Sequence, residues 1–325
     1  MTKIIKQELI HRLADGHFIS GQDIADELGV SRAAISKQIK LFADMGLDVF
    51  SVKGKGYKLS EPLDLLAKDK ILAHFPVKAD DIDLEVHSLI DSTNSFLLRK
   101  LPNQLSIGHT CVAEYQSAGR GRRGREWVSP FGANIYLSMY WPVEQGMAAA
   151  MGLNIVAALA VSDAINQLFG IKVQLKWPND IYLDGVKLAG ILIDLEGQPL
   201  ETCHSVIGIG LNLNMPANVA NKVDQPWTDL QQHVGRPINR NQLVATLIIC
   251  LYKRLVEHAE HGLTDMVSAW QKQDFFFNKP VNLITGDKTL LGTCKGINSQ
   301  GALLLESAGE LKTIYGGEVS LRAGK

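Results

Sequence analysis

The loop at residues 119–124 has the composition most suggestive of chemistry, because it consists of three glycines and three arginines. Glycine lets backbone N–H groups come close to a ligand. Arginine keeps its charge and presents a planar fork of donors to phosphate or carboxylate. The loop is therefore suited to binding an anion. Since a basic hexamer is more often a solvated loop or a nucleic-acid patch, its neighbours in the sequence must decide between these interpretations.

Two well-known phosphate loops are excluded by the context of residues 119–124. The glycine spacing matches G-x-G-x-x-G, but that dinucleotide-binding fingerprint opens a helix. The residues that follow, Arg-Glu-Trp-Val-Ser-Pro-Phe-Gly at 125–132, cannot begin one. A P-loop would end in Gly-Lys followed by Ser or Thr, and this loop has no such ending.

Other stretches bring polar side chains to places where a strand or helix should begin or end. Asp-Ser-Thr-Asn at 91–94 is expected at a helix N-terminus, where free N–H groups and side-chain amides point at one place. Gln116 lies at the expected end of a strand, directly before the loop. Lys-Trp-Pro-Asn-Asp at 176–180 puts a lysine and an aspartate around a bend, and Lys187 begins an apolar strand. Taken singly, these are an N-cap, a solvated turn and a snorkelling lysine, so only their combination indicates a site.

A central domain of strands and helices must position these stretches. Strand-like and helix-like apolar patterns alternate, which predicts a mixed α/β domain. Asp184-Gly185 separates two expected strands and predicts a tight hairpin. The expected strands are 110–115, 134–140, 173–177, 181–183, 186–195 and 205–212, and the expected long helices are about 145–168 and 240–260.

Residues 1 to about 60 have the pattern of a winged helix-turn-helix domain. Gly29 permits the turn, and Ser31 can cap the following helix, whose exposed face is polar and basic. Residues 49–59 predict a β-hairpin with a basic tip, as a wing has. A helical hairpin with a solvated basic face would explain the helices but not the wing. The residues expected to contact DNA are Ser31, Arg32, Ser36, Lys37, Lys40, Lys53 and Lys55.

Short strands separated by glycine turns follow the central domain and predict a small β-barrel. The expected strands are 281–284, 290–296, 302–306 and 311–315.

The composition limits the classes of function. With a formal net charge of -1, any nucleic-acid binding must rest on a local basic patch. The four cysteines are far apart and form no C-x-x-C pair, which argues against a disulfide framework or a zinc site and fits a reducing cytosol. The N-terminus lacks the apolar core of a signal peptide, and the apolar run 147–165 is too short and too polar to cross a membrane. We expect a cytoplasmic protein with no membrane partner.

The loop 119–124, the runs 176–180 and 187–191 and the strand 208–214 together resemble the biotin protein ligases. With a winged helix-turn-helix in front, the chain resembles along essentially its whole length the bifunctional bacterial members, which also repress the biotin operon.

The resemblance implies a multidomain α+β fold. A winged helix-turn-helix domain is expected at 1–62 and a mixed α/β catalytic domain, similar to that of class II aminoacyl-tRNA synthetases, at 63–273. A small SH3-like β-barrel is expected at 274–325.

A two-step reaction is also implied by the resemblance. Biotin and ATP, which carries Mg²⁺ on its phosphates, give biotinyl-5′-AMP and pyrophosphate. The adenylate then acylates a lysine on the biotin carboxyl carrier protein of acetyl-CoA carboxylase. Because the carboxylate of biotin is ionised at neutral pH, the first step needs positive charge and alignment rather than a general base.

The same resemblance assigns the site residues. The implied catalytic residues are Arg122, Asp180 and Lys187. The residues expected to hold biotin and its adenylate are Ser92, Thr93, Asn94, Gln116, Arg120, Gly121, Arg122 and Lys187. The adenylate loop is expected to include Arg123, Arg125, Asn212 and Trp227, and no metal held by the protein itself is expected.

Biotinyl-5′-AMP is implied as a corepressor. Its binding is expected to order the arginine-rich loop and to promote a homodimer whose two winged domains bind operator DNA of the biotin operon. Two alternatives stay open. A lipoate-type ligase is disfavoured by the winged domain and the arginine-rich loop, and a biotin-sensing repressor without catalytic activity is disfavoured by the presence of Lys187 and the arginines.

Overall fold

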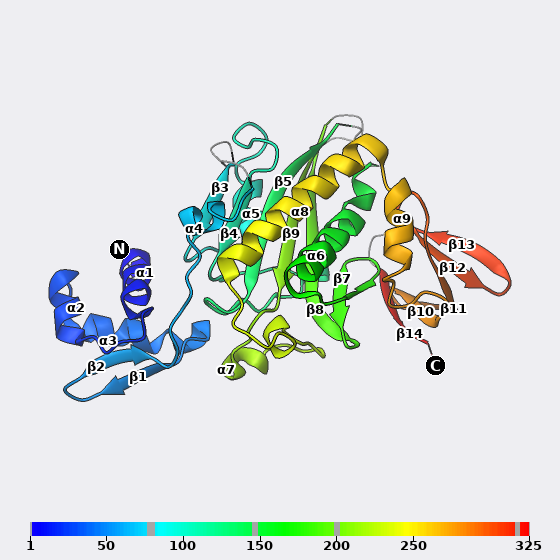
Figure 1. The fold of residues 1–325 in the computed structure, drawn as a ribbon. Helices are drawn as coiled ribbons and strands as arrows, with labels where there is room; N and C mark the ends of the chain where they lie inside the picture. Colours follow the sequence, from blue (N-terminus) through cyan, green and yellow to red (C-terminus); the bar gives the residue numbers. More distant parts are fainter. Residues whose placement is uncertain (1, 77–81, 145–148, 198–201, 316–318, 325) are drawn as a thin grey trace.

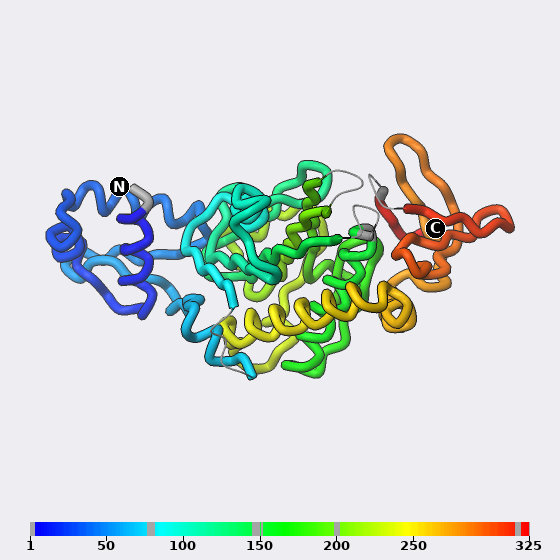
Figure 2. Tube along the Cα trace, turned by 90° about the horizontal axis from the view of Figure 1, so that it is seen from above, coloured from blue at the N-terminus to red at the C-terminus, as the bar shows by residue number. Residues whose placement is uncertain are grey.

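The chain folds into three units arranged in a row, from the blue N-terminal end to the red C-terminal end of Figure 1. The computed structural model describes residues 2–76, 82–144, 149–197, 202–315 and 319–324. Figure 2 shows the same order from above, with the largest unit between the other two.

The N-terminal unit is a helix-turn-helix followed by a two-stranded wing. Ser20 and Ser31 cap its second and third helices, since their hydroxyl oxygens accept hydrogen bonds from backbone N–H groups of the first turn. Gly29 adopts a φ of +63° in the turn between these helices. The expected winged helix-turn-helix is confirmed. Its elements are α1 Thr2–Leu13, α2 Gly21–Glu27, α3 Arg32–Lys40, the 3-10 turn η1 Ala43–Met45, β1 Val49–Val52 and β2 Gly56–Leu59.

A seven-stranded mixed sheet forms the central unit. Its strands are β3 Leu84–His87, β4 Thr110–Ala113, β5 Ile135–Val143, β6 Gln174–Lys176, β7 Asp180–Leu183, β8 Val186–Glu196 and β9 Cys203–Leu211. The order is β3-β4-β5-β9-β8-β7-β6. β3 and β4 run parallel, and the other neighbours are antiparallel. Asp184 and Gly185 both have positive φ in the turn between β7 and β8, as the expected tight hairpin requires.

The two long helices of the central unit pack on one face of this sheet. The long ones are α6 Leu153–Phe169, preceded by the 3-10 turn η3 Ala149–Gly152, and α8 Arg240–His261. Both were expected, although residues 145–148 of the first prediction lie outside the described residues. The shorter ones are α4 Lys68–Leu72, α5 Thr93–Leu98, η2 Arg122–Gly124, α7 Ala217–Ala220, η4 Leu230–Gln232 and α9 Thr264–Gln271.

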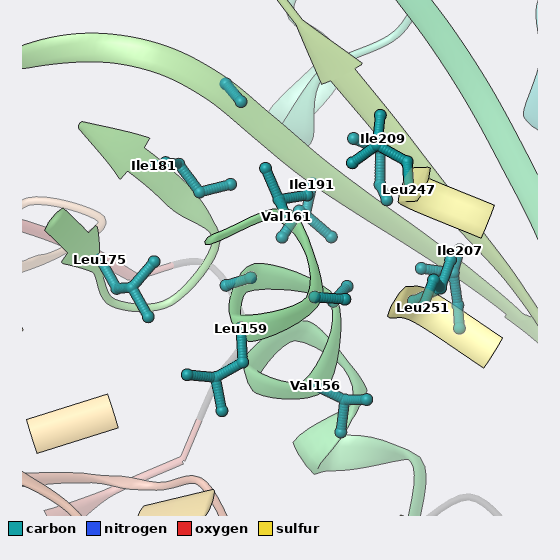
Figure 3. Packing of buried hydrophobic residues seen from close by; sticks show 14 of the residues in the cluster. Val156, Leu159, Val161, Leu175, Ile181, Ile191, Ile207, Ile209, Leu247 and Leu251 are labelled. Atoms are coloured by element: carbon teal, nitrogen blue, oxygen red, sulfur yellow. The ribbon is translucent and has the colours of Figure 1, made fainter. Parts of the chain in front are cut away.

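Apolar residues and glycines alternate along two central strands, and this alternation decides which face of the sheet packs against the core and which face stays open. Ile191, Ile207 and Ile209 pack against α6 and α8, as Figure 3 shows. Because successive residues of a strand point to opposite faces, Gly208 and Gly210 face away from these helices. The sequence thus puts a large apolar core on one face and side-chain-free backbone on the other.

The C-terminal unit is a five-stranded antiparallel sheet in the order β13-β12-β11-β10-β14. Its strands are β10 Pro280–Thr285, β11 Lys288–Ile297, β12 Leu303–Ser307, β13 Glu310–Ile314 and β14 Val319–Ala323. Four of them were expected from the sequence, and β14 was not. In the described part of the chain, no helix is long and apolar enough to cross a membrane.

A buried ion pair anchors the segment that links the winged unit to the central unit. Arg240, at the start of α8, lies 2.7 Å from Glu114, and their side chains are only 6% and 3% exposed. Arg240 also donates to the carbonyl of Asp64 at 2.9 Å, and the backbone N–H of Leu66 donates to Glu114. The neighbouring Asn241 hydrogen bonds to the same linker. The path of the linker is therefore fixed by charged and amide groups of the central unit.

The apolar core of the winged unit also extends into the central unit. Leu89 and Phe131 belong to the same buried cluster as the helices of the winged unit. The backbone N–H of Phe131 donates to the carbonyl of Met45 at 2.8 Å. The two units are thus joined by packing and by backbone hydrogen bonding as well as by the linker.

Replacing Arg240 with alanine is expected to destabilise the protein by about 3–5 kcal/mol, because Glu114 would be left as an uncompensated buried charge. Lys253→Ala on the exposed face of the same helix is the matched control, with an expected loss below about 0.5 kcal/mol. Urea unfolding followed by circular dichroism measures both. Equal unfolding midpoints for the two variants would show that the buried pair does not anchor the fold.

Candidate active site

A pocket opens on the glycine face of the central sheet and gathers most of the residues expected from the sequence. It is reached by the helix start at 92–94, the loop at 119–127, the β6–β7 turn and the β8–β9 pair. The predicted residues that line it are Ser92, Thr93, Asn94, Gln116, Arg120, Gly121, Arg122, Arg123, Arg125, Asp180 and Lys187. Asn212 and Trp227 do not line it, but they line a second pocket that shares Arg125, Trp127 and Lys187 with the first.

Glycines in β8 and β9 leave room for two side chains in the pocket. A Cβ on Gly210 would lie 2.4 Å from an indole carbon of Trp127, and a Cβ on Gly208 would lie 2.2 Å from Oδ1 of Asn94. A Cβ on Gly190 would lie 3.0 Å from the same indole. The glycines of this face are therefore required for space, since none of the three has a positive φ.

Hydrogen-bonded polar groups line one end of the pocket. Gln116 accepts from the backbone N–H of Thr93 at 2.9 Å and donates to Ser129 at 3.0 Å. Ser138 hydrogen bonds to both Thr93 and Asn94. Ser92 caps α5 through its hydroxyl, so this end also carries the N-terminus of a helix. Such a lining suits a small neutral ligand group with several donors and acceptors.

The glycine–arginine loop forms a short hairpin over the pocket. Arg120 and Glu126 form an antiparallel bridge, and the N–H of Gly121 donates to the carbonyl of Arg125 at 2.7 Å. Arg122 donates to Oδ1 of Asn179 at 3.0 Å, which joins the loop to the turn after β6. Burial lowers the pKa of Arg122 from its usual range, and the negative charge of nearby Asp180 opposes that shift. The loop thus holds Arg122 half-buried in the pocket wall, while Arg120 and Arg123 line the pocket and stay exposed.

Cationic side chains line the other end of the pocket. Nζ of Lys187 lies 2.7 Å from Asp180 and 5.5 Å from the ring centre of Trp127. Nζ of Lys176 donates to the hydroxyl of Tyr182 at 2.9 Å, and burial lowers the pKa of Lys176 to about 8. The positive charges of Lys176 and Lys187 repel each other, so a bound anionic ligand would relieve that repulsion.

Several lining residues were not assigned to the site from the sequence. Lys176 stands in the run 176–180, which was expected to belong to the site, although the lysine itself was given no role. Trp127 follows the arginine-rich loop, and a tryptophan next to that loop was the one feature that could have marked it as a site residue. Arg322 comes from β14 of the C-terminal unit and lines the cationic end. No local motif marks Arg322, so the sequence held no signal for it.

The residues expected to contact DNA lie on the winged unit, away from the pocket. Arg32, Lys37 and Lys40 are exposed on α3, where Ser31 is the N-cap and Ser36 is half-buried. Lys53 and Lys55 are exposed at the tip of the wing. The structure therefore gathers these side chains on a helix and a hairpin of one small domain.

Comparisons with known proteins agree with this division of the chain. Residues 6–58 match a helix-turn-helix domain, residues 86–212 match the biotin/lipoate A/B protein ligase family, and residues 276–322 match the biotin protein ligase C-terminal domain.

Two full-length relatives are similar along nearly the whole chain. The bifunctional ligase/repressor BirA of Salmonella typhimurium is 48% identical over 317 residues, which cover 98% of this chain and 97% of that protein. The protein of the same name from Escherichia coli strain K12 is 47% identical over 318 residues, with the same coverage. The biotin protein ligase of Aquifex aeolicus, solved in complex with biotin and ATP, has 26% identity and a TM-score of 0.64. It covers 74% of this chain and 99% of its own.

Gly210→Ala is expected to displace Trp127 and to lower the free energy of unfolding by about 1–3 kcal/mol, because the added methyl group overpacks the slot. Gly235→Ala is the matched control, since a Cβ at Gly235 would have no neighbour within 4 Å. Urea unfolding of both variants decides the point. If Gly210→Ala were as stable as the control, the indole would not be confined by the glycine face.

Proposed function

The chain belongs to the family of bifunctional biotin ligase/repressors, and we propose that it makes biotinyl-5′-AMP from biotin and ATP, biotinylates the biotin carboxyl carrier protein of acetyl-CoA carboxylase, and represses the biotin operon when adenylate is bound. It is thus a biotin protein ligase with a DNA-binding domain. One observation carries the proposed chemistry: a single pocket joins a neutral, hydrogen-bonding end to a cationic end. Biotin has a neutral ureido ring and a carboxylate, and ATP is a polyanion, so each end has a matching ligand group.

In the first step, a carboxylate oxygen of biotin attacks the α-phosphorus of ATP. The bond from that phosphorus to the bridging oxygen of the β-phosphate breaks, and pyrophosphate leaves. Both reactants are anions, so catalysis consists of alignment and of positive charge placed where negative charge shifts. We assign this charge to Arg122 and Lys187, and Asp180 holds the lysine in place through their 2.7 Å contact.

The ureido ring is assigned to the polar end of the pocket. Ser92, Thr93, Asn94 and Gln116 line this end together with the helix N-terminus. Both amide protons of Asn94 are already donated, one to Asp194 at 2.9 Å and one to the carbonyl of Leu192 at 3.2 Å. Asn94 therefore has no proton left to donate, and its oxygen, which already accepts from Ser138, is the atom assigned to accept from a ring N–H group.

The adenine ring is assigned to the second pocket. The backbones of Trp227 and Lys187 pair in an isolated parallel β-bridge. Asn212, which also lines this pocket, is buried, and its side-chain amide donates to the carbonyl of Thr228 at 3.1 Å. The indole of Trp227 offers a flat apolar surface on which a purine can stack. Arg123, Arg125 and Gly121 line the first pocket, and Arg125 also lines the second. These three residues are assigned to the phosphate and ribose.

The β- and γ-phosphates of ATP are assigned to Lys176 and Arg322 at the cationic end. Mg²⁺ is proposed to arrive on the ATP phosphates, where it neutralises part of their charge. Among the described residues, no group of three His, Cys, Asp or Glu side chains could hold a metal ion.

In the second step, the neutral amine of the acceptor lysine attacks the acyl carbon of the adenylate. An amide bond forms, AMP leaves with the bonding electrons of the acyl–oxygen bond, and the amine loses a proton. The nucleophile is supplied by the carrier protein, so the chain needs to hold the mixed anhydride and protect it from water. We assign this protection to the loop hairpin at 119–127.

The remaining assignments concern organisation and regulation. We propose domain boundaries at 62/63 and 273/274, a cytoplasmic location that suits the four unpaired, buried cysteines, and biotinyl-5′-AMP as the corepressor. In this proposal a twofold homodimer presents two winged domains to operator half-sites, with Arg32, Lys37 and Lys40 toward the bases and phosphates.

The ligase assignment is tested by transfer of labelled biotin to purified carrier protein. Lys187→Ala is expected to lower the rate of adenylate formation by about 10²–10³-fold, because the charge acts on the transition state, and to change biotin binding little. Lys172→Ala, an exposed lysine before β6, is the control. Transfer of lipoate in place of biotin would favour the lipoate-type alternative, and binding of biotin without any transfer would favour the sensor without catalysis.

The lowered pKa of Lys176 predicts a pH dependence. Since Lys176 is charged only below about pH 8, the value of kcat/KM for ATP should fall as pH rises through that point. Lys176→Arg should remove this decline, because arginine keeps its charge. Steady-state kinetics between about pH 7 and 9, with biotin saturating, measure both. A wild-type profile that is flat over this range would exclude Lys176 from the phosphate site.

The proposed switch predicts that biotinyl-5′-AMP promotes dimers more strongly than biotin alone. Analytical ultracentrifugation of the full chain without ligand, with biotin and with biotinyl-5′-AMP compares the three states at equal protein concentration. The weight-average sedimentation coefficient should rise most with the adenylate. The same dimer fraction in all three samples would leave the ligase intact and remove the adenylate-controlled dimer.

A further inference from the structure

Asp194 contacts two separate parts of the pocket wall at once. Its carboxylate accepts from Nδ2 of Asn94 at 2.9 Å and from the guanidinium of Arg120 at 2.7 Å. A second guanidinium nitrogen of Arg120 lies 3.5 Å from the other carboxylate oxygen. One acidic side chain therefore joins the helix start at the polar end to the glycine–arginine loop.

The two ends of this contact differ in how firmly they are held. Asp194 lies within β8 and pairs with Val206 in the β8–β9 ladder. Arg120 lies in the loop hairpin, and its side chain is 42% exposed against 22% for Asp194. The carboxylate of Asp194, which is fixed by the sheet, thus holds the side chain of Arg120 from the more exposed loop. Breaking the contact should release the loop and leave the sheet unchanged.

The same carboxylate also fixes the orientation of the Asn94 amide. With Nδ2 directed at Asp194 and at the carbonyl of Leu192, Oδ1 is directed at Ser138. A flipped amide would place its oxygen against two acceptors, which is repulsive. Asp194 therefore dictates that Asn94 presents an acceptor, not a donor, at the polar end of the pocket.

We propose that Asp194 is a positioning residue of the ligase reaction, which latches the glycine–arginine loop through Arg120 and sets the acceptor face of the biotin site through Asn94. The inference rests on the proposed ligase function. It assigns the charge of Arg120 to closing the loop, whereas Arg122 and Lys187 supply the charge for the anhydride phosphate.

The experiment compares Asp194→Asn, Arg120→Gln and the double variant in the full-length chain. Glu196→Gln is the matched control, because Glu196 is an exposed carboxylate two residues along the same strand face. Three quantities are measured: the rate at which purified enzyme releases labelled biotinyl-5′-AMP, the KM for biotin, and the saturating rate of adenylate formation.

Asp194→Asn should release the adenylate at least about 10-fold faster and raise the KM for biotin about 10-fold, as loss of a charge-assisted hydrogen bond implies. The saturating rate of adenylate formation should change less than about twofold, since the phosphate-binding charges remain. Arg120→Gln should speed release without raising the KM as much, because Asn94 stays oriented. The double variant should release no faster than Asp194→Asn, because both changes break one contact.

The salt dependence of the adenylate release rate distinguishes a latch from a purely structural role of Asp194. Because the Arg120–Asp194 pair is partly exposed, the salt-dependent part of the release rate should be smaller in both single variants than in the wild type. Arg120→Gln changes only the loop, so it tests the latch even if Asp194→Asn is poorly folded.

Wild-type release rates, KM and salt dependence in both single variants would overturn the latch while the ligase function stands. A fall in saturating rate and thermal stability with unchanged salt dependence would also overturn it. A wild-type chain that forms no biotinyl-5′-AMP would instead refute the proposed function, and the latch with it.

Discussion

The packing of Trp127 against the glycine face of β8 and β9 is the constraint on which the site depends. The indole needs the space left by Gly190 and Gly210, and it lies beneath Nζ of Lys187 at 5.5 Å. Its backbone N–H donates to the carbonyl of Gly119 at 2.9 Å, which closes the base of the arginine-rich hairpin. One ring therefore sets the position of the loop, of a cationic lysine and of the wall shared by the two pockets.

The segment that follows Trp127 connects the pocket to the winged domain within a few residues. Ser129 hydrogen bonds to Gln116 at the polar end, and Phe131 is buried in the core of the winged unit. The N–H of Gly132 donates to the carbonyl of Glu114, whose side chain pairs with Arg240 and holds the linker. A ligand that moved Trp127 or Gln116 would act directly on groups that also hold the DNA-binding unit. For the same reason, removal of residues 1–62 would expose Phe131 and Leu89 to solvent. The ligase unit therefore has an apolar surface where it meets the winged unit.

Local sequence patterns predicted much of the fold, because apolar residues recur with one period in strands and with another in helices. The runs 134–140, 186–195 and 205–212 alternate or are continuously apolar, and each became a strand. β3, α9 and β14 were not predicted, since four to eight residues are too few to show a clear period. The site was predicted where its residues stand together in motifs, as in 119–124 and 176–180. Trp127, Arg322 and Asp194 could not be assigned, because their roles come from contacts between strands, loops and domains that are far apart in sequence.

Carboxylates beside the cations explain how the pocket keeps so much positive charge in one place. A buried cation is costly unless it is paired, and Lys187, whose side chain is 13% exposed, has the carboxylate of Asp180 at 2.7 Å. The more exposed Arg120 also has a carboxylate at 2.7 Å. Lys176 instead donates to the hydroxyl of Tyr182, and its pKa falls to about 8. A phosphate entering the pocket must therefore compete with Asp180 for Lys187, whereas at Lys176 it meets an ammonium group that donates to the Tyr182 hydroxyl and feels Asp180 only through its charge. The net gain from binding is smaller than a count of the cations suggests, because part of their charge is already used. That limit suits a ligase, since AMP and pyrophosphate have to leave the same charges that aligned the reaction.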